Sequence, residues 1–412
     1  MKQKKNILIF CDTFLPPAYK PRVRYFCNYF VKNGYNLTMI TEYNSEQKFL
    51  PSDFPVYSID YYRFRNNFVY RFEWLVKIIL NLFFPHKSIF FYRKSKKIVK
   101  NQHFDIVFCS ADFHSFPLTT AAMLAKKFNV PLFIDLRDIF EQTPDNSFVA
   151  WKSTNFFDKI IVNFYKKVNI KRRNKVLKNS TCVTSVSNWH IQFLKQFNPS
   201  THLIYNGFDE NLFIPKDQKS DKFFISYFGI IYDENMRNPK ILCQAIENIK
   251  NKISAKKFQI KWFVDDNSKK IIQKLAQQFD IEKFMFFENF VFEDKLLFEM
   301  NNSAILLVLC NSASKKKYSG IMTTKFFEYI GVNRPILCTP NNNDELAETI
   351  NSIGCGLVSS DVTEIENFIL EKYQEWQKND FTKSIINEEI RSRFSRKNGA
   401  EILEKLFLEV LK

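Results

Sequence analysis

Short apolar runs alternate with longer mixed segments along the whole chain. In the first half these runs are NILIFC (6–11), NLTMIT (36–41), FDIVFCS (104–110), VPLFIDL (130–136), TCVTSVS (181–187) and THLIYNG (201–207). Runs that are apolar at consecutive positions are typical of parallel strands buried on both faces. The longer segments between them have helical spacing. The pattern therefore predicts an α/β fold with a parallel sheet covered by helices on both faces.

The alternation restarts in the second half after a polar stretch without periodicity. The second series is FFISYFG (223–229), FQIKWFV (258–264), FMFFENF (284–290), AILLVLC (304–310), PILCTP (335–340) and GLVSS (356–360). The stretch 208–222 between the two series predicts a linker. We therefore expect two Rossmann-like domains, at 1–212 and 213–390. A final segment, 391–412, has no strand after it and predicts a helix with apolar positions Ile402, Leu403, Leu406, Phe407 and Val410.

Composition narrows the class of protein without naming a function. The chain has 412 residues and a formal net charge of +17, which favours contact with nucleic acid, acidic lipid headgroups or phosphorylated ligands. Its eight cysteines occur singly, as expected for buried free thiols in a reducing compartment. No apolar run reaches the roughly 18 residues that a spanning helix needs, and the first run is too short for a signal sequence. These features predict a cytoplasmic protein.

Glycine is so scarce, at eight residues, that each one is expected where another residue would clash. Gly229 ends the first strand of the second half. Gly320 precedes a short helix in the segment YSGIMTTKFFEY, which continues with two threonines. In open parallel sheets, ligands bind at the carboxyl ends of the strands. Both glycines therefore mark a candidate ligand site.

The helix that follows Gly320 predicts an anion site at its first turn. Free N–H groups and the helix dipole attract negative charge there, and Lys325 adds a full positive charge. Glu328 lies about 4.5 Å further along the helix axis, within reach of the hydroxyls of a sugar attached to a phosphate. The spacing alone leaves open a second interpretation, a Lys–Glu pair on the protein surface.

Several segments resemble the retaining GT-B glycosyltransferases usually numbered family four. SGIMTTKFFEYIGVNRPIL resembles the donor-binding segment of that family, and FIDLRDIF (133–140) matches its D-x-R-D motif. IYNGFDENLFIP (204–215) matches the N-G-x-D segment, and YFGIIYDENMRNPKIL (227–242) is similar to the first turn of the second domain. The opening strand, proline loop and arginine-bearing helix at 12–41 complete the order found in the family.

The resemblance implies an enzyme that transfers a sugar from a nucleotide-sugar to a glycan or lipid-linked acceptor. It implies a role in bacterial polysaccharide or lipopolysaccharide biosynthesis, retention of configuration, and no metal or other cofactor. The second domain is expected to bind the donor and the first the acceptor, with the last helix crossing back to the first domain. The alternative is a non-catalytic protein of GT-B fold that binds a membrane surface or nucleic acid.

The resemblance also implies roles for individual residues of the second domain. Lys325 and Arg237 are expected to neutralise the diphosphate, and Glu328 to bind the ribose hydroxyls. The family often carries an acid eight residues before this glutamate, where the chain has Gly320, so contacts to the donor sugar must come from elsewhere. The residues expected to bind the donor are Gly229, Arg237, Gly320, Thr323, Thr324, Lys325 and Glu328.

In the first domain, three residues are expected to act in catalysis and two further ones at the acceptor. His114 follows a strand and is expected to face the acceptor, although a structural role stays open. Arg137 is expected to meet a phosphate of donor or acceptor, and Asp138 to orient Arg137 or cap a helix. Arg22 and Arg24, on the first helix, are expected to bind the acceptor.

The stretch 61–100 mixes arginine and lysine with aromatic and aliphatic residues. Such a composition serves single-stranded nucleic acid or an amphipathic helix on an anionic bilayer, and it is also compatible with helices packed inside the first domain. The chain carries no nucleic-acid motif, so a nucleic-acid partner is not expected. A peripheral position at the inner face of the cell membrane and internal packing both remain open.

Overall fold

The computed structural model describes residues 5–14, 21–43, 52–64, 67–142, 156–231, 237–311 and 320–412. The proline loop expected after the first strand falls at 15–20 and lies outside these residues.

The chain divides into two compact units. Unit 1 joins Met1–Tyr205 to Gly399–Lys412, and unit 2 is Asn206–Asn398. The predicted limits at 212 and 390 differ from these because the residues just beyond Tyr205 pack within unit 2. Phe208 and Phe213 lie so close to Gly331 that a Cβ atom there would stand 2.6 Å from the Cβ of Phe213.

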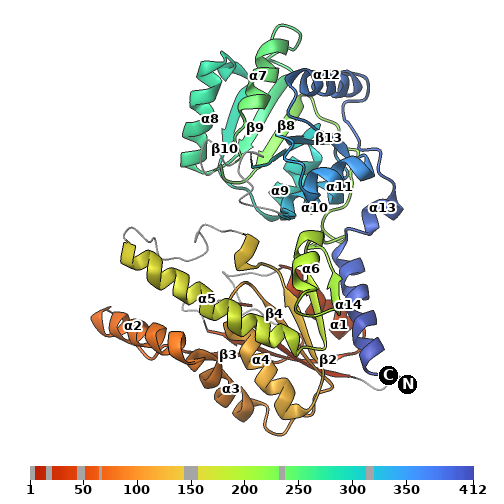
Figure 1. The fold of residues 1–412 in the computed structure, drawn as a ribbon. Coiled ribbons are helices and arrows are strands. Elements are labelled where there is room, and N and C mark those ends of the chain that lie inside the picture. The colour runs from red at the N-terminus through yellow and green to blue at the C-terminus, as the bar shows by residue number, and fades with distance from the viewer. Residues whose placement is uncertain are drawn as a thin grey trace. The chain divides into compact units, whose positions relative to one another are not determined.

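Unit 1 contains a parallel sheet of seven strands in the order β3-β2-β1-β4-β5-β6-β7 (Figure 1). The strands are β1 (Asn6–Cys11), β2 (Asn36–Glu42), β3 (Val56–Ile59), β4 (Ile106–Ala111), β5 (Leu132–Leu136), β6 (Cys182–Ser185) and β7 (Thr201–Leu203). Sequence analysis missed β3. This edge strand exposes Tyr57 and Ser58, so it lacks the continuous apolar run that marks the central strands.

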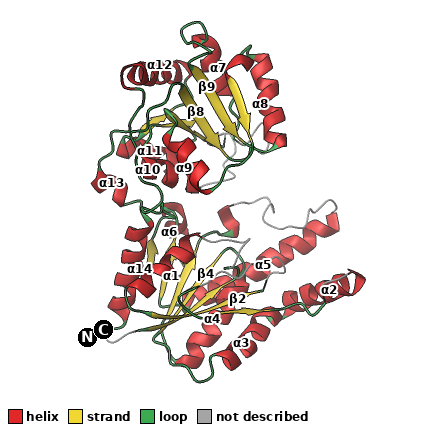
Figure 2. Ribbon diagram, turned by 180° about the vertical axis from the view of Figure 1, so that it is seen from behind, coloured by secondary structure: helices red, strands yellow, loops and turns green. Residues whose placement is uncertain are grey.

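Helices cover both faces of this sheet (Figure 2). They are α1 (Pro21–Lys32), α2 (Asn67–Phe83), α3 (His86–Ile98), α4 (Ser115–Phe128), α5 (Phe156–Lys178) and α6 (Asn188–Leu194), together with the short turn η1 (Phe140–Gln142). β1 is buried on both sides because its side chains alternate. Leu8 and Phe10 join one apolar cluster with residues of α3 and α4, and Ile7 and Ile9 join the other with residues of α1.

The last helix, α14 (Arg396–Val410), packs on unit 1 beside α1. The ring of Phe407 stacks on Phe30 with centroids 5.2 Å apart, and it meets Phe133 edge-on at 4.6 Å. Leu403, Leu406 and Phe407 are buried as the helical spacing predicted, whereas Val410 is exposed. Val410 belongs to the last turn and faces solvent, whereas Leu411 packs against the apolar cluster of unit 1.

Unit 2 contains a parallel sheet of six strands in the order β10-β9-β8-β11-β12-β13. The strands are β8 (Phe223–Phe228), β9 (Phe258–Phe263), β10 (Met285–Glu288), β11 (Ile305–Leu309), β12 (Ile336–Thr339) and β13 (Gly356–Val358). The helices are α7 (Lys240–Ile249), α8 (Asp266–Gln278), α9 (Glu293–Asn301), α10 (Thr324–Val332), α11 (Glu345–Ile353), α12 (Val362–Asn379) and α13 (Glu388–Ser392), with the turn η2 (Glu282–Phe284). The prediction of two α/β units with parallel sheets is confirmed.

The basic and aromatic stretch 61–100 is partly packed and partly exposed. Tyr61 and Phe91 are buried in unit 1, whereas α2 presents apolar side chains to solvent along much of its length. None of the helices in the described ranges is by itself long and apolar enough to cross a bilayer. Only α2 and α3 taken together meet that test, and a bend of 96° separates them.

Candidate active site

Gly229 and Lys325 meet at the carboxyl end of β8. A Cβ atom on Gly229 would stand 1.8 Å from the Nζ of Lys325, and φ at this glycine is +145°. The ammonium group also lies 4.8 Å from the centre of the Tyr227 ring. Any side chain at position 229 would therefore displace the ammonium group. The two residues that sequence analysis placed at one site, nearly a hundred positions apart, lie against each other.

The first turn of α10 is arranged to receive an anion. Thr323 takes the N-cap position with extended backbone angles, and its side chain makes no capping hydrogen bond to the helix. Thr324 and Lys325 follow in the first turn. N–H groups at a helix N-terminus that are not capped by a side chain remain available to a phosphate.

Arg237 brings a second positive charge to the same place. Its backbone is in the left-handed region, with φ of +61°, and its guanidinium donates a hydrogen bond to the Ile230 carbonyl at 3.1 Å. Arg237 and Lys325 line one cavity of about 50 Å³. The other residues around this cavity are Tyr227, Val308, Leu309, Cys310, Asn311, Ile321, Thr323, Asn342, Asp344 and Leu346.

The charges on Lys325 and Glu328 are both opposed by their surroundings. Burial, with a further contribution from Arg237, lowers the pKa of Lys325 to about 7. Burial raises the pKa of Glu328 to about 7, although Arg396 and Lys325 oppose that rise. Both side chains are half-buried, and the ammonium of Lys325 lies over the Tyr227 ring. A solvated surface pair does not describe this arrangement, whereas shifted pKa values of this kind are typical of functional sites.

Asp344 is a residue of this site that sequence analysis missed. Its carboxylate accepts the backbone N–H of Gly320 at 3.0 and 3.1 Å and caps α11 through the N–H of Glu345 at 2.9 Å. The Gly320 N–H is thus bound within the protein, and φ here is +67°. Asp344 lies 24 positions after Gly320, so local spacing could not join them. Its place as an N-cap was the available signal.

His114 lines a larger cavity in unit 1, at the carboxyl ends of β1, β2 and β4. The hydroxyl of Tyr165 lies 3.2 Å from the Nδ1 of His114, and the imidazole packs against the Phe113 ring at 4.4 Å between centroids. The cavity measures about 370 Å³. A histidine that lines such a space is suited to contact a polar ligand there.

Arg137 and Asp138 follow β5 directly. The guanidinium of Arg137 forms an ion pair with Asp112, which lies just after β4. Burial disfavours the charge on Arg137, but Asp112 and other nearby acids raise its pKa above the usual range. Asp138 is half-buried beside it. The arginine is therefore always charged, and Asp112 is an ionic partner of it.

The structure assigns Arg22 a different role from the expected one. Its guanidinium donates to Asp135 at 2.8 and 3.2 Å and also to the Tyr205 carbonyl, and both charged side chains are almost fully buried. Arg22 therefore joins α1 to the sheet and is not available to an acceptor. Arg24, two residues further along the same helix, is half-buried.

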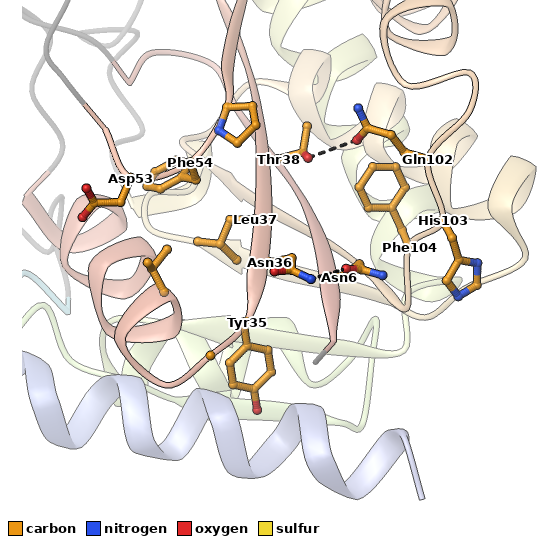
Figure 3. Close-up of a pocket in the computed structure, with 13 residues that line it drawn as sticks. Asn6, Tyr35, Asn36, Leu37, Thr38, Asp53, Phe54, Gln102, His103 and Phe104 are labelled. Carbon is orange, nitrogen blue, oxygen red and sulfur yellow. Dashed lines mark hydrogen bonds between the residues drawn. The ribbon is translucent and has the colours of Figure 1, made fainter. Parts of the chain in front are cut away.

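A second hollow of unit 1, about 530 Å³, lies at the opposite edge of the sheet (Figure 3). Here the polar groups pair with one another, as Asn36 donates to Asn6 at 2.9 Å and Thr38 to Gln102 at 3.1 Å. These residues stand at the amino ends of β1 and β2. Ligands of open parallel sheets bind at the carboxyl ends, so we do not assign this hollow to the active site.

Residues 22–212 match the family model described as Glycosyltransferase Family 4. In the described ranges, no three His, Cys, Asp or Glu side chains are grouped as metal ligands. No curated protein matches the sequence.

Solved structures share the fold over the whole chain. A glycosyltransferase from Rickettsia africae ESF-5 is 15% identical with a TM-score of 0.64, over 100% of this chain and 99% of that one. Anabaena Alr3699/HepE in complex with UDP is 12% identical with a TM-score of 0.62, over 98% and 100%. WaaG, a glycosyltransferase involved in lipopolysaccharide biosynthesis, is 10% identical with a TM-score of 0.52, over 98% of both chains.

Proposed function

The chain is a GT-B glycosyltransferase of the family-four type, and from this premise we propose a substrate class and a mechanism. It transfers a sugar from a nucleotide-sugar to a glycan or lipid-linked acceptor, with retention of configuration and without a metal ion. The observation that carries the proposal is the meeting of Lys325 and Arg237 around one small cavity at the N-terminus of α10. Two cations and a helix N-terminus are suited to a diphosphate.

Unit 2 supplies the donor chemistry in this proposal. Lys325, Arg237 and the first-turn N–H groups of α10 bind the diphosphate and stabilise the negative charge that grows on it as the sugar leaves. A divalent metal serves that purpose in other enzymes. Glu328, one turn further along α10, accepts hydrogen bonds from the ribose hydroxyls. The HepE structure with UDP supports a nucleoside diphosphate as the leaving group.

Unit 1 supplies the acceptor site. His114 lines its cavity and contacts a bound acceptor there. Arg137, whose charge Asp112 maintains, attracts a phosphate group, with Asp138 at its side. Arg24 remains a candidate acceptor ligand, whereas Arg22 does not.

The donor experiment tests turnover directly. The purified protein is incubated with uridine, guanosine, adenosine and thymidine diphospho-sugars, with and without EDTA, and released nucleoside diphosphate and free sugar are measured. One donor should be hydrolysed slowly, equally well with EDTA, and the sugar should appear first in the anomeric form of the donor. Loss of turnover in EDTA that Mg²⁺ restores would refute the metal-independent mechanism. Absence of turnover with every donor, together with no thermal stabilisation, would favour a binding protein of this fold.

Glu328→Gln refines the same experiment. The variant should discriminate less between the preferred nucleoside diphosphate and its 2′-deoxy form, because the ionised carboxylate is the stronger acceptor of a hydroxyl hydrogen bond. Unchanged discrimination would remove Glu328 from the ribose site without affecting the transferase assignment.

We further propose that the enzyme works in bacterial polysaccharide or lipopolysaccharide biosynthesis at the inner face of the cell membrane. The lipopolysaccharide role of WaaG supports the pathway, and the exposed apolar side chains of α2 together with nearby Arg63 and Arg71 support the location. Anionic vesicles should retain the protein at low salt, and less of it as salt screens the charges. Arg63→Gln with Arg71→Gln should reduce retention without lowering the melting temperature. Equal retention by neutral and anionic vesicles would contradict an electrostatic contribution.

A further inference from the structure

The cavity that contains His114 has one polar end and one apolar wall. The polar end is formed by Asp12 and His114, which follow strands β1 and β4, and by Tyr165 of α5. The apolar wall comes from two helices outside the sheet, α2 and α5, through Trp74, Ile78, Leu82, Ile161 and Val162. At about 370 Å³ the cavity falls in the range of small-molecule sites. A purely hydrophilic sugar would leave the apolar wall without a partner.

The apolar wall continues to the outside of the molecule. Trp74 and Ile161 both line the cavity, yet they are 37% and 39% exposed. Figures 1 and 2 both show α2 and α5 side by side at one edge of unit 1. Further apolar side chains on the same two helices are exposed without lining the cavity, among them Phe72, Leu75, Ile79 and Phe83 on α2 and Ile160 and Phe164 on α5. A hydrocarbon chain could therefore pass from the cavity to the surface in continuous apolar contact.

Arg172 of α5 stands where this wall meets the polar end. Its guanidinium donates to the carbonyls of Asn81 and Leu82, the latter at 3.2 Å. Among the described residues, these two neutral carbonyls are its hydrogen-bond acceptors. The pKa of Arg172 is lowered by burial. Both carbonyls belong to the last turn of α2, whose partial negative charge offsets only part of the charge on Arg172. An anion inside the cavity would balance the rest.

We propose that this cavity binds an acceptor built on a lipid phosphate. The phosphate pairs with Arg172, the sugar or hydroxyl end points to His114 and Asp12, and the hydrocarbon chain leaves between Trp74 and Ile161. This deepens the proposed function, on which it rests, by selecting the lipid-linked class over a soluble glycan.

Binding of simple probes tests the inference without knowledge of the donor. Dodecyl phosphate, dodecanol and inorganic phosphate are titrated into the full-length protein below the micellar concentration, with tryptophan fluorescence and calorimetry as readouts. Dodecyl phosphate should bind at least about tenfold more tightly than either of the others, since only it fills both parts of the site. A nucleoside diphosphate is titrated into the same samples as an independent measure of the donor site.

Matched variants on α5 distinguish the cavity from the surface around it. Ile161→Glu places a charge in the cavity wall, whereas Ile160→Glu places the same charge on the exposed neighbour that does not line it. Arg172→Gln removes the proposed phosphate ligand, whereas Lys171→Gln removes an exposed charge next to it. The first member of each pair should weaken dodecyl phosphate binding about tenfold, and the second should leave it nearly unchanged. Arg172→Lys should restore part of the loss, and melting curves identify any variant that is unfolded.

Several results would overturn the inference. Equal weakening by Ile160→Glu and Ile161→Glu would mean that the hydrocarbon adsorbs on the α2 and α5 surface, as a bilayer would. Equal affinity for dodecyl phosphate and inorganic phosphate would remove the role of the apolar wall. Absence of dodecyl phosphate binding, with nucleoside diphosphate still bound, would reject the lipid acceptor alone. The reverse result would reject the proposed donor chemistry and leave a lipid phosphate site.

Discussion

Each unit holds a pair of oppositely charged side chains near the carboxyl ends of its strands, Arg22 and Asp135 in unit 1 and Lys325 and Glu328 in unit 2. The surrounding protein compensates the charges of the first pair fully and those of the second pair only in part. In unit 1, Asp135 accepts two hydrogen bonds from Arg22, one from Ser110 at 3.1 Å and one from Thr184 at 2.9 Å. Burial opposes the charge on Asp135, but Arg22 lowers its pKa below the usual value. Both charged groups of this pair therefore have their hydrogen-bond partners inside the protein.

In unit 2, Lys325 and Glu328 stand one turn apart and neither charge is compensated to that degree. Burial lowers the pKa of Lys325 to about 7 and raises that of Glu328 to about 7. The lysine shares its cavity with Arg237, a second cation, whereas the acid on that cavity, Asp344, accepts backbone N–H groups. The comparison indicates that a complete buried network serves the fold, whereas buried charges that are only partly compensated are retained for a ligand.

The largest effect, a loss of stability, should follow from breaking the fully compensated Arg22–Asp135 pair. Asp135→Asn leaves Arg22 as an uncompensated buried charge and should lower the free energy of unfolding by about 3–5 kcal/mol. Denaturant unfolding followed by circular dichroism measures it. Asp280→Asn is the matched control, because Asp280 pairs with Lys250 at 2.7 Å while its side chain is 86% exposed, and it should change stability little. Equal effects of the two variants would contradict a structural role for the Arg22–Asp135 pair.

A smaller effect, on ligand binding and not on folding, should follow from a change in the Lys325–Glu328 pair. Lys325→Met keeps much of the side-chain volume but removes the charge, so nucleoside diphosphate binding should weaken by about 1.5–3 kcal/mol. The melting temperature should not fall, because the variant also removes a charge that burial disfavours. Lys240→Met, at an exposed position of α7, is the control. Calorimetry that gives the same affinity for wild type and Lys325→Met would end the diphosphate assignment.

The parts of the site that could be predicted from the sequence are those set by local patterns. Apolar runs identified the central strands, and the rule that ligands bind at strand ends pointed to Gly229 and Gly320. The resemblance to the family placed Lys325 at the same donor site as Gly229. The apolar pattern did not identify β3, because this edge strand is half exposed and shows no continuous apolar run. The helical spacing at the end of the chain identified α14, although it could not tell that Val410 is exposed.

What the sequence could not predict was the partner of each charged residue. Arg22 and Asp135 are 113 positions apart, and both have the charge and place expected of ligand-binding residues, so their mutual pairing was visible only in the structure. The same holds for Asp344, which binds the N–H of Gly320. Composition and periodicity report burial and secondary structure, but a salt bridge depends on side-chain positions that long-range topology determines.

The smallest expected effect is a pH dependence of nucleotide affinity, which arises from the Lys325–Glu328 pair. The ammonium form of Lys325 binds the diphosphate, and its pKa in the free protein is about 7. Above that pH the free protein has lost the proton, so nucleotide binding must take one up, and affinity falls as pH rises. Between about pH 7.5 and 9 the fall should approach tenfold for each pH unit, as long as the bound lysine keeps its proton. Phosphate groups, with a second pKa near 6, are already ionised in this range, and so is Glu328. Calorimetry in buffers of different ionisation enthalpy should show proton uptake near pH 8 for wild type and none for Lys325→Met. A wild-type affinity that stays constant over this range would mean that Lys325 is protonated throughout, and that the pair in unit 2 is as well compensated as the pair in unit 1.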